Sequence, residues 1–178
     1  MHIFINKKYL TCGQYKVKCA VGKRGVNLKK KEGDFITPIG LYKIKYILYR
    51  KDRIKKIPSK LRKIRIKKNM GWCDDPKSKR YNKLVNLPFS YGYEQLFKKE
   101  NIYDIVLVLN YNMNPVKKDK GSAIFVHVAK KNYEKTRGCV AVKKLELLKI
   151  LKKIKVKTKV KIERQKYNFQ FLQRLLHN

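Results

Sequence analysis

Acidic residues are scarce in this sequence. Its 178 residues include 12 Asp and Glu against 47 Lys and Arg, which gives a formal net charge of +35. Such an excess of one sign predicts attraction to polyanions, including nucleic acid, anionic lipid and anionic cell-wall polymer. Because the lysines are spread along the whole chain and form no single basic tail, solvated surface charge without a specific partner is an equally good interpretation.

Patterned cysteines and long apolar runs are also missing. The 4 cysteines contain no C-x-x-C pair, so a zinc ribbon or a disulfide scaffold is not indicated, and we expect no metal and no cofactor. No run approaches the roughly 18 apolar residues of a membrane span. Residues 1–10 show no signal peptide, since an apolar segment followed by a cleavage site is absent there.

The length and composition suit one domain. A chain of 178 residues with 43% hydrophobic content is long enough for one substantial core and short for two. The sequence shows no internal repeat and no low-complexity linker. We therefore predict a single domain over residues 1–178.

Patterns of period two predict a fold rich in strands. Polar and apolar residues alternate, as is typical of strands with one buried face, over 15–21, 41–50, 122–129 and 157–163, and less clearly near 61–67. The nearly continuous apolar run DIVLVLNYN, residues 104–112, predicts a central strand that is buried on both faces. Residues 22–40 and 70–88 contain many turn formers and polar side chains, and we expect loops there.

Helices are expected in three places. Residues 142–154 predict an amphipathic helix, because apolar side chains recur at steps of three, at Val142, Leu145, Leu148 and Leu151. A short helix is expected around 92–99, and a C-terminal helix over 168–176. The predicted fold class is therefore mainly β with a few helices (α+β).

One His and one Cys are arranged in a way that suits acyl transfer. Alternation places His127 on the face of its strand opposite to Val126 and Val128. Twelve residues later, Gly138 provides backbone freedom directly before Cys139. A nearby His can remove the thiol proton, and the N–H groups of Gly138 and Cys139 could hold an oxyanion.

Positive charge around this Cys would favour its thiolate. The helix expected from residue 142 would place its N-terminus near Cys139, and Arg137 adds a permanent charge two residues away. The spacing alone is weak support for catalysis, because a free Cys is more often a small buried hydrophobe than a nucleophile. Trp72, Tyr111 and Asn112 could line a cleft, although packing or turn chemistry is the simpler interpretation.

The segment H-V-A…T-R-G-C-V-A, residues 127–141, resembles the active-site signature of the YkuD-type L,D-transpeptidase catalytic domain family. The upstream stretch KKKEGDFITPIGLYKI resembles that family's turn before a strand, and WCDDPKSKRYN, YDIVLVLNYN and GSAIFVHVA are similar to one divergent subgroup. The resemblance covers about residues 15–150, which is most of the chain.

This resemblance implies a YkuD-like β-sandwich catalytic domain and a cysteine-dependent L,D-transpeptidase. Such an enzyme attacks peptidoglycan stem peptides, forms a thioester acyl-enzyme and passes the acyl group to an amine, or to water as an L,D-carboxypeptidase. Carried over by residue, Cys139 matches the nucleophile, His127 the base, Gly138 the Gly before the nucleophile and Thr136 the Ser/Thr that opens the segment. A role in cell-wall biogenesis and cell shape would follow.

The chain departs from the family signature at two positions. Arg137 replaces a His, so that His127 must act as the base alone, because an Arg keeps its proton. Ala141 replaces an Arg, which leaves the binding of the substrate carboxylate to another residue, such as one of the many lysines.

The partners and the location follow from the same resemblance. Stem peptides and anionic wall polymers are the expected partners, and the cell envelope or periplasm is the implied location, with a cytoplasmic location left open because no signal peptide is visible. Two rival interpretations are a basic nucleic-acid-binding protein, given the charge and the 11% aromatic content, and a catalytically inactive wall-binding relative.

Overall fold

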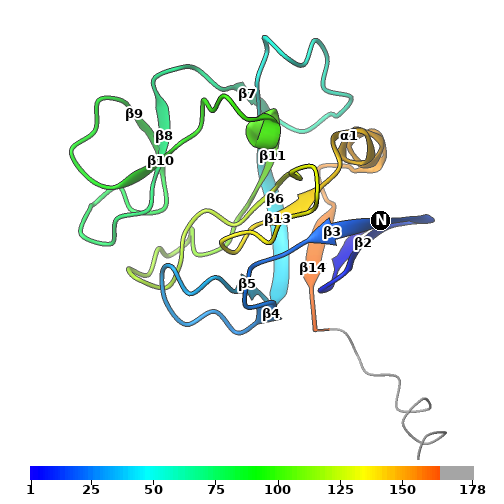
Figure 1. Cartoon of the computed structure of the whole chain (residues 1–178), viewed down its shortest axis with the longest axis horizontal. Coiled ribbons are helices and arrows are strands. Elements are labelled where there is room, and N and C mark those ends of the chain that lie inside the picture. Colours follow the sequence, from blue (N-terminus) through cyan, green and yellow to red (C-terminus); the bar gives the residue numbers. More distant parts are fainter. Residues whose placement is uncertain (165–178) are drawn as a thin grey trace, which may run out of the picture.

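The computed structural model describes residues 1–164, and one large sheet forms its centre (Figure 1). The strands of this sheet are β1 (Ile3–Ile5), β2 (Tyr9–Cys12), β3 (Tyr15–Ala20), β6 (Gly40–Tyr49), β7 (Lys63–Arg65), β11 (Ile105–Leu109), β12 (Phe125–Val128), β13 (Val140–Val142) and β14 (Lys159–Ile162). They are ordered β11-β12-β13-β3-β2-β1-β14-β6-β7.

The sheet closes on itself because β6 also pairs with β11. The long strand β6 therefore has antiparallel neighbours on both sides, β14 near its start and β11 near its end. Eight strands form the closed ring, and β7 attaches outside it in parallel with β6. Where a sandwich of two layers was expected, the strands therefore form one continuous, closed sheet. The prediction of a mainly β, YkuD-like domain is confirmed.

Smaller elements lie beside the closed sheet. A three-stranded sheet contains β8 (Met70–Cys73), β9 (Leu84–Asn86) and β10 (Tyr93–Gln95), and a two-stranded one pairs β4 (Val26–Asn27) with β5 (Thr37–Pro38). The 3-10 helix η1 (Asn101–Tyr103) precedes β11, and α1 (Lys144–Lys153) follows β13. Figure 1 shows the β8–β9–β10 sheet to one side of the closed sheet and α1 near the opposite side.

Strand β11 separates two hydrophobic cores. Ile105, Leu107 and Leu109 belong to the larger core inside the closed sheet, together with residues of α1. Val106 and Val108 point the other way, into a smaller core that also contains Trp72. All five residues of β11 are buried, so the predicted strand buried on both faces is confirmed.

The helix predicted over 142–154 is confirmed as α1, but its buried face is not the predicted one. Leu147, Ile150 and Leu151 are buried, whereas Leu145 is 72% exposed. A step of three residues turns the helix by about 300° and drifts around its surface, whereas spacings of three and four keep to one side. The side chains of α1 that are buried in the core therefore follow the i, i+3, i+4 spacing.

Two local predictions around the small sheet are wrong. Residues 93–95 form strand β10 where a helix was expected, because Tyr93 and Gln95 pair with Cys73 and Gly71 of β8. The segment expected as a polar loop contains β8, whose four residues are all buried. Pairing with a distant strand overrode the local pattern in both cases. The C-terminal helix predicted over 168–176 lies outside the described residues.

Among residues 1–164, none of the helices has both the length and the apolar character needed to cross a membrane.

Candidate active site

His127 lies on the outer face of the closed sheet. It is the third residue of β12, whose alternate residues Val126 and Val128 point into the larger core. The residue is only 7% exposed, and its ring packs edge-on against Tyr103, with the ring centroids 5.5 Å apart. The outward orientation predicted from the alternation of β12 is what the structure has.

The tautomer of His127 follows from its backbone contact. Nδ1 lies 2.9 Å from the carbonyl oxygen of Val128. Because a carbonyl only accepts hydrogen bonds, Nδ1 carries the hydrogen, and in the neutral ring the basic lone pair is on Nε2. Burial lowers the pKa of His127, although hydrogen bonds to the backbone of Val128 and Ile102 and the carboxylate of Glu94 oppose this shift. A neutral imidazole with a basic Nε2 is therefore the resting form.

Cys139 is placed beside the same strand. Strand β13 begins one residue after it and runs parallel to β12, with Val140 opposite Val126 and Ala141 opposite His127. Cys139 packs against the smaller core, to which Phe125 of β12 belongs. The two candidate residues therefore share the outer face of two adjacent strands. Cys139 is partly exposed, whereas Cys12, Cys19 and Cys73 are buried.

The sulfur of Cys139 contacts the backbone just before and within β12. Its thiol donates to the carbonyl oxygen of Ala123 at 3.0 Å, and the N–H of Phe125 approaches the sulfur at 3.4 Å. The first contact stabilises the neutral thiol and the second stabilises the thiolate. The thiol hydrogen is thus directed at a carbonyl in the resting protein.

The expected help from a helix N-terminus is not present. α1 begins at Lys144, and all of β13 lies between it and Cys139. A helix dipole acts within about one turn of the helix end, so that α1 does not favour the thiolate. Burial, followed by the carboxylate of Glu94, raises the pKa of Cys139 to about 12. The prediction of a thiolate stabilised at rest is therefore wrong.

Two threonine hydroxyls hold the backbone around Cys139. Thr37 donates to the carbonyl oxygen of Gly138 at 2.8 Å, and Thr136 donates to that of Cys139 at 2.6 Å. The N–H of Gly138 donates to the hydroxyl of Thr136 at 3.1 Å. Because the N–H of Gly138 already donates to Thr136, this geometry does not support the oxyanion role predicted for that group.

Gly138 is required by its conformation. Its φ is 142°, which a residue with a side chain rarely adopts, and an added Cβ would meet the carbonyl oxygen of Ile36 at 3.1 Å. Ile36 directly precedes Thr37, so the same segment both crowds Gly138 and binds its carbonyl. The turn ahead of Thr37 therefore helps to shape the nucleophile loop.

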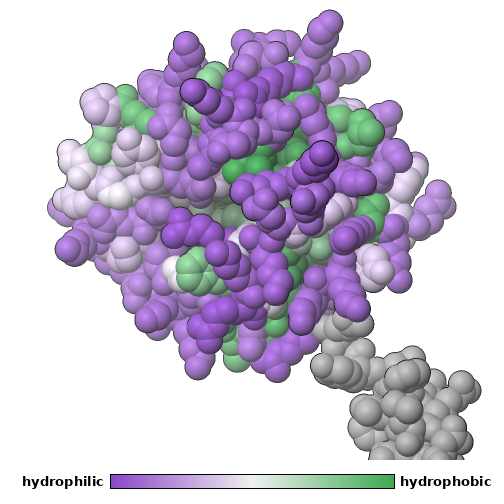
Figure 2. All heavy atoms as spheres, in the orientation of Figure 1, coloured by the Kyte–Doolittle hydropathy of each residue, from purple (hydrophilic) through white to green (hydrophobic). Residues whose placement is uncertain are grey.

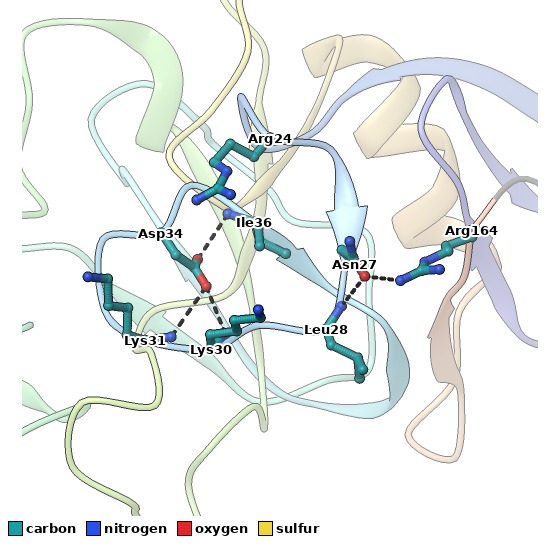
Figure 3. Close-up of a pocket in the computed structure, with 8 residues that line it drawn as sticks. All are labelled: Arg24, Asn27, Leu28, Lys30, Lys31, Asp34, Ile36 and Arg164. Carbon is teal, nitrogen blue, oxygen red and sulfur yellow. Dashed lines mark hydrogen bonds between the residues drawn. The ribbon is translucent and has the colours of Figure 1, made fainter.

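Asp34 organises that turn. Its carboxylate accepts hydrogen bonds from Lys29 Nζ at 2.5 Å and from the N–H groups of Lys30 at 2.8 Å and Ile36 at 3.0 Å. Burial alone would raise the pKa of Asp34, but these donors lower it. A pocket of about 450 Å³ opens beside this turn, and Figure 3 shows Arg24 and Arg164 among its lining residues.

Arg137 is exposed beside the site. Its guanidinium carbon lies 5.9 Å from the centroid of the Phe35 ring. It also exerts a positive potential on Asp74 and on Tyr103 next to His127. A permanent cation is thus close to the outer face of β12, although burial controls the pKa of Cys139.

Several residues of the site had weak signals or none in the sequence. Thr37 and Asn82 lie inside the segments that resemble the family, but no local pattern assigns them a role. Tyr103 begins the segment YDIVLVLNYN, which also resembles the family, whereas Glu94 has no such signal. The pairing of β10 with β8 and the position of η1 bring both residues near Cys139, and only the tertiary structure shows this.

The face of the molecule seen in Figure 2 is strongly hydrophilic, because hydrophilic side chains cover most of it and only small hydrophobic areas lie between them. Within residues 1–164, no cluster of three or more His, Cys, Asp or Glu side chains is arranged to hold a metal ion.

The family model of the YkuD L,D-transpeptidase catalytic domain matches residues 2–162. The chain belongs to this family. Its matched region contains the outer face of β12 and β13 with His127 and Cys139. The family acts on peptidoglycan and is typically found in the cell envelope.

Among solved structures, Bd1075 of Bdellovibrio bacteriovorus aligns with this YkuD chain with a TM-score of 0.45 and 16% sequence identity, over 99% of this chain and 55% of that one. This chain thus spans about half the length of the Bd1075 chain. No curated protein matches the chain at a significant level.

Proposed function

We propose that this protein is a cysteine-dependent L,D-transpeptidase that acts on peptidoglycan stem peptides through a thioester acyl-enzyme. The observation that carries the proposal is the shared outer face of β12 and β13. It holds the partly exposed Cys139 and a neutral His127 whose Nδ1 donates to a carbonyl. Membership of the YkuD family supplies the substrate class.

The reaction begins with proton transfer. Substrate binding redirects the thiol hydrogen of Cys139 from the Ala123 carbonyl to Nε2 of His127, which is the basic nitrogen. Since the pKa of Cys139 is raised and that of His127 is lowered, the resting pair is neutral. The thiolate therefore forms only as the sulfur attacks the L,D carbonyl of the stem peptide.

The remaining steps use the same two residues. The N–H of Cys139 stabilises the oxyanion, since the N–H of Gly138 already donates to Thr136. The imidazolium of His127 protonates the departing amine of the terminal D-amino acid. An amine of a second stem peptide, or water, then attacks the thioester and releases Cys139. The first acceptor makes the protein a transpeptidase and the second an L,D-carboxypeptidase.

Arg137 is a candidate for binding the substrate carboxylate. It is exposed, it lies next to Gly138, and its charge reaches the groups around His127. The residue at position 141 cannot serve, because Ala141 has no charge and is buried in β13. The location implied by such a substrate is the cell envelope.

The experiment is intact-protein mass spectrometry after incubation with a carbapenem, which acylates the nucleophile of this family. We expect one covalent adduct on the wild-type protein and none on Cys139→Ala. Incubation with purified tetrapeptide muropeptides, with and without an acceptor amine, then distinguishes cross-linking from hydrolysis. A folded wild-type protein that forms no adduct and leaves muropeptides intact would contradict the proposal and favour an inactive wall-binding relative.

A further inference from the structure

The peptide that receives the thiol of Cys139 has an unusual backbone conformation. Ala123 has a φ of 44°, in the left-handed region that residues with a side chain rarely adopt. Its carbonyl oxygen nevertheless accepts the thiol of Cys139 at 3.0 Å. Because such a conformation persists only when its surroundings enforce it, a contact must hold the Ala123 peptide in place.

Asn82 provides that contact. Its side chain is buried, and Oδ1 accepts hydrogen bonds from the N–H of Ala123 at 3.0 Å and from Nε1 of Trp72 at 3.1 Å. Nδ2 donates to the carbonyl oxygens of Tyr111 at 3.0 Å and Asn112 at 2.7 Å. With two donors at one end and two acceptors at the other, the amide has only one satisfactory orientation.

These four bonds connect separate parts of the chain. Trp72 belongs to β8 of the small sheet, Tyr111 and Asn112 follow β11, and Ala123 precedes β12. Trp72 also packs edge-on against Phe125, with centroids 5.1 Å apart. The side chain of Asn82 is therefore the point where the small sheet meets the backbone that contacts the nucleophile.

We propose that Asn82 is a positioning residue for Cys139: it holds the N–H of Ala123 and so fixes the backbone of this residue, whose carbonyl accepts the thiol hydrogen. The bond stabilises the neutral thiol and keeps the sulfur next to the N–H of Phe125 until substrate displaces the hydrogen toward His127. The proposal deepens the function proposed above and relies on it for turnover, but the reactivity of the thiol can be measured without any substrate.

The test compares two glycine variants. Asn82→Gly removes the amide but keeps the backbone relaxed, because Asn82 has a φ of 57°. Asn112→Gly is the matched control: Asn112 has a φ of 48°, and its side chain bonds to Lys117 and Gly121 but not to Ala123. Both variants lose an amide from the same region, and only one loses the bond to Ala123.

The probe is alkylation by iodoacetamide between pH 7 and 10. The thiolate displaces iodide, so that a C–S bond forms, the C–I bond breaks and the thiol proton passes to solvent. Mass spectrometry of the peptide that contains Cys139 gives the rate. The buried Cys12, Cys19 and Cys73 report on the fold, because they become alkylated only when the protein opens.

We expect the two rates of Asn82→Gly to change in opposite directions. Loss of the carbonyl acceptor lowers the pKa of Cys139 by about one unit, which raises alkylation at pH 8 about tenfold. Acylation by a carbapenem falls about tenfold, because the sulfur is no longer held in place. Asn112→Gly stays within about twofold of the wild type in both measurements.

The proposal is overturned if a folded Asn82→Gly keeps the wild-type pH profile, or if Asn112→Gly shifts it equally. Should Asn82→Gly unfold, which alkylation of all four cysteines would reveal, Trp72→Phe decides. It removes one donor to Asn82 and keeps an aromatic ring against Phe125, and an unchanged pH profile then rejects the proposal. If the pH profile of Asn82→Gly shifts but the wild-type protein reacts with neither carbapenems nor muropeptides, the result would support positioning by Asn82 and reject the proposed substrate.

Discussion

The two faces of strand β12 differ in what they contact and in how strictly these contacts fix the choice and position of the side chains. Val126 and Val128 point into the closed sheet, where they belong to the larger hydrophobic core. Phe125 and His127 point outward to Trp72 and Tyr103, where each ring has a defined partner and angle. The inner face depends on volume, which many aliphatic side chains can supply, whereas the outer face depends on the position of individual atoms.

Polar groups on the outer face are held by backbone atoms. The imidazole of His127 donates to Val128, and the thiol of Cys139 donates to Ala123. Hydroxyls of Thr37 and Thr136 hold the loop that carries Cys139. A site assembled in this way is preorganised by the sheet itself, so that substitutions on the two faces should have separable effects.

The largest effect is expected at His127. His127→Gln removes the basic Nε2, so that acylation of Cys139 by a carbapenem should slow by about 10²- to 10⁴-fold. The measurement is the rate of adduct formation at pH 7 by mass spectrometry. Equal rates in the variant and the wild type would show that another group accepts the thiol proton.

The pH dependence of the thiol tests the neutral resting pair. Because burial raises the pKa of Cys139 to about 12, its thiolate fraction, and with it the rate of iodoacetamide alkylation, should rise about tenfold per pH unit from pH 7 to 10. A thiolate already paired with an imidazolium would give a flat profile over this range. A plateau near neutral pH would therefore contradict a neutral pair.

The same neutral state makes folding stability depend on pH. The pKa of His127 is lowered in the folded protein, so the unfolded chain binds the proton first as the pH falls through about 6.5. The contribution of His127 is therefore favourable above that pH and is lost below it. In urea titrations at pH 7.5 and 5.5, the wild type should lose more stability on acidification than His127→Gln; equal losses would show that His127 is protonated in the folded state.

The inner face should affect stability and not chemistry. Val126 is completely buried, and Val126→Ala removes two methyl groups from the core, which should cost about 2 kcal/mol of the free energy of unfolding. Urea denaturation measures this loss. Acylation of the folded variant should remain within about twofold of the wild type; a large loss of rate would mean that the two faces are not independent.

The smallest effect is expected at Leu145. Because this side chain is 72% exposed on α1, Leu145→Ala should change the free energy of unfolding by less than about 0.5 kcal/mol. The matched variant Leu147→Ala empties a buried position and should cost about 2–5 kcal/mol. Similar losses from both variants would show that the predicted face of α1, with Leu145 in the core, is the correct one.

Local sequence patterns determined much of the scaffold and part of the site. The alternation of β12 placed His127 opposite to Val126, and the continuous apolar run of β11 indicated a strand between two cores. The segment around Gly138 and Cys139 resembled a family signature, and a family match now covers residues 2–162. These features depend on residues that are neighbours in the chain, which is why periodicity and motifs reveal them.

Only the tertiary structure decided the rest, because it depends on contacts between distant segments. Pairing of β6 with β11 closes the sheet, and pairing with β8 makes residues 93–95 a strand. The core, and not the step of three, chose the buried side of α1. Asn82 meets Ala123 across 41 positions of sequence, and β13 separates Cys139 from the helix that was expected to activate it. A hydrogen bond or a packing contact acts over a few ångströms in space, and local periodicity contains no information about which distant residues will meet.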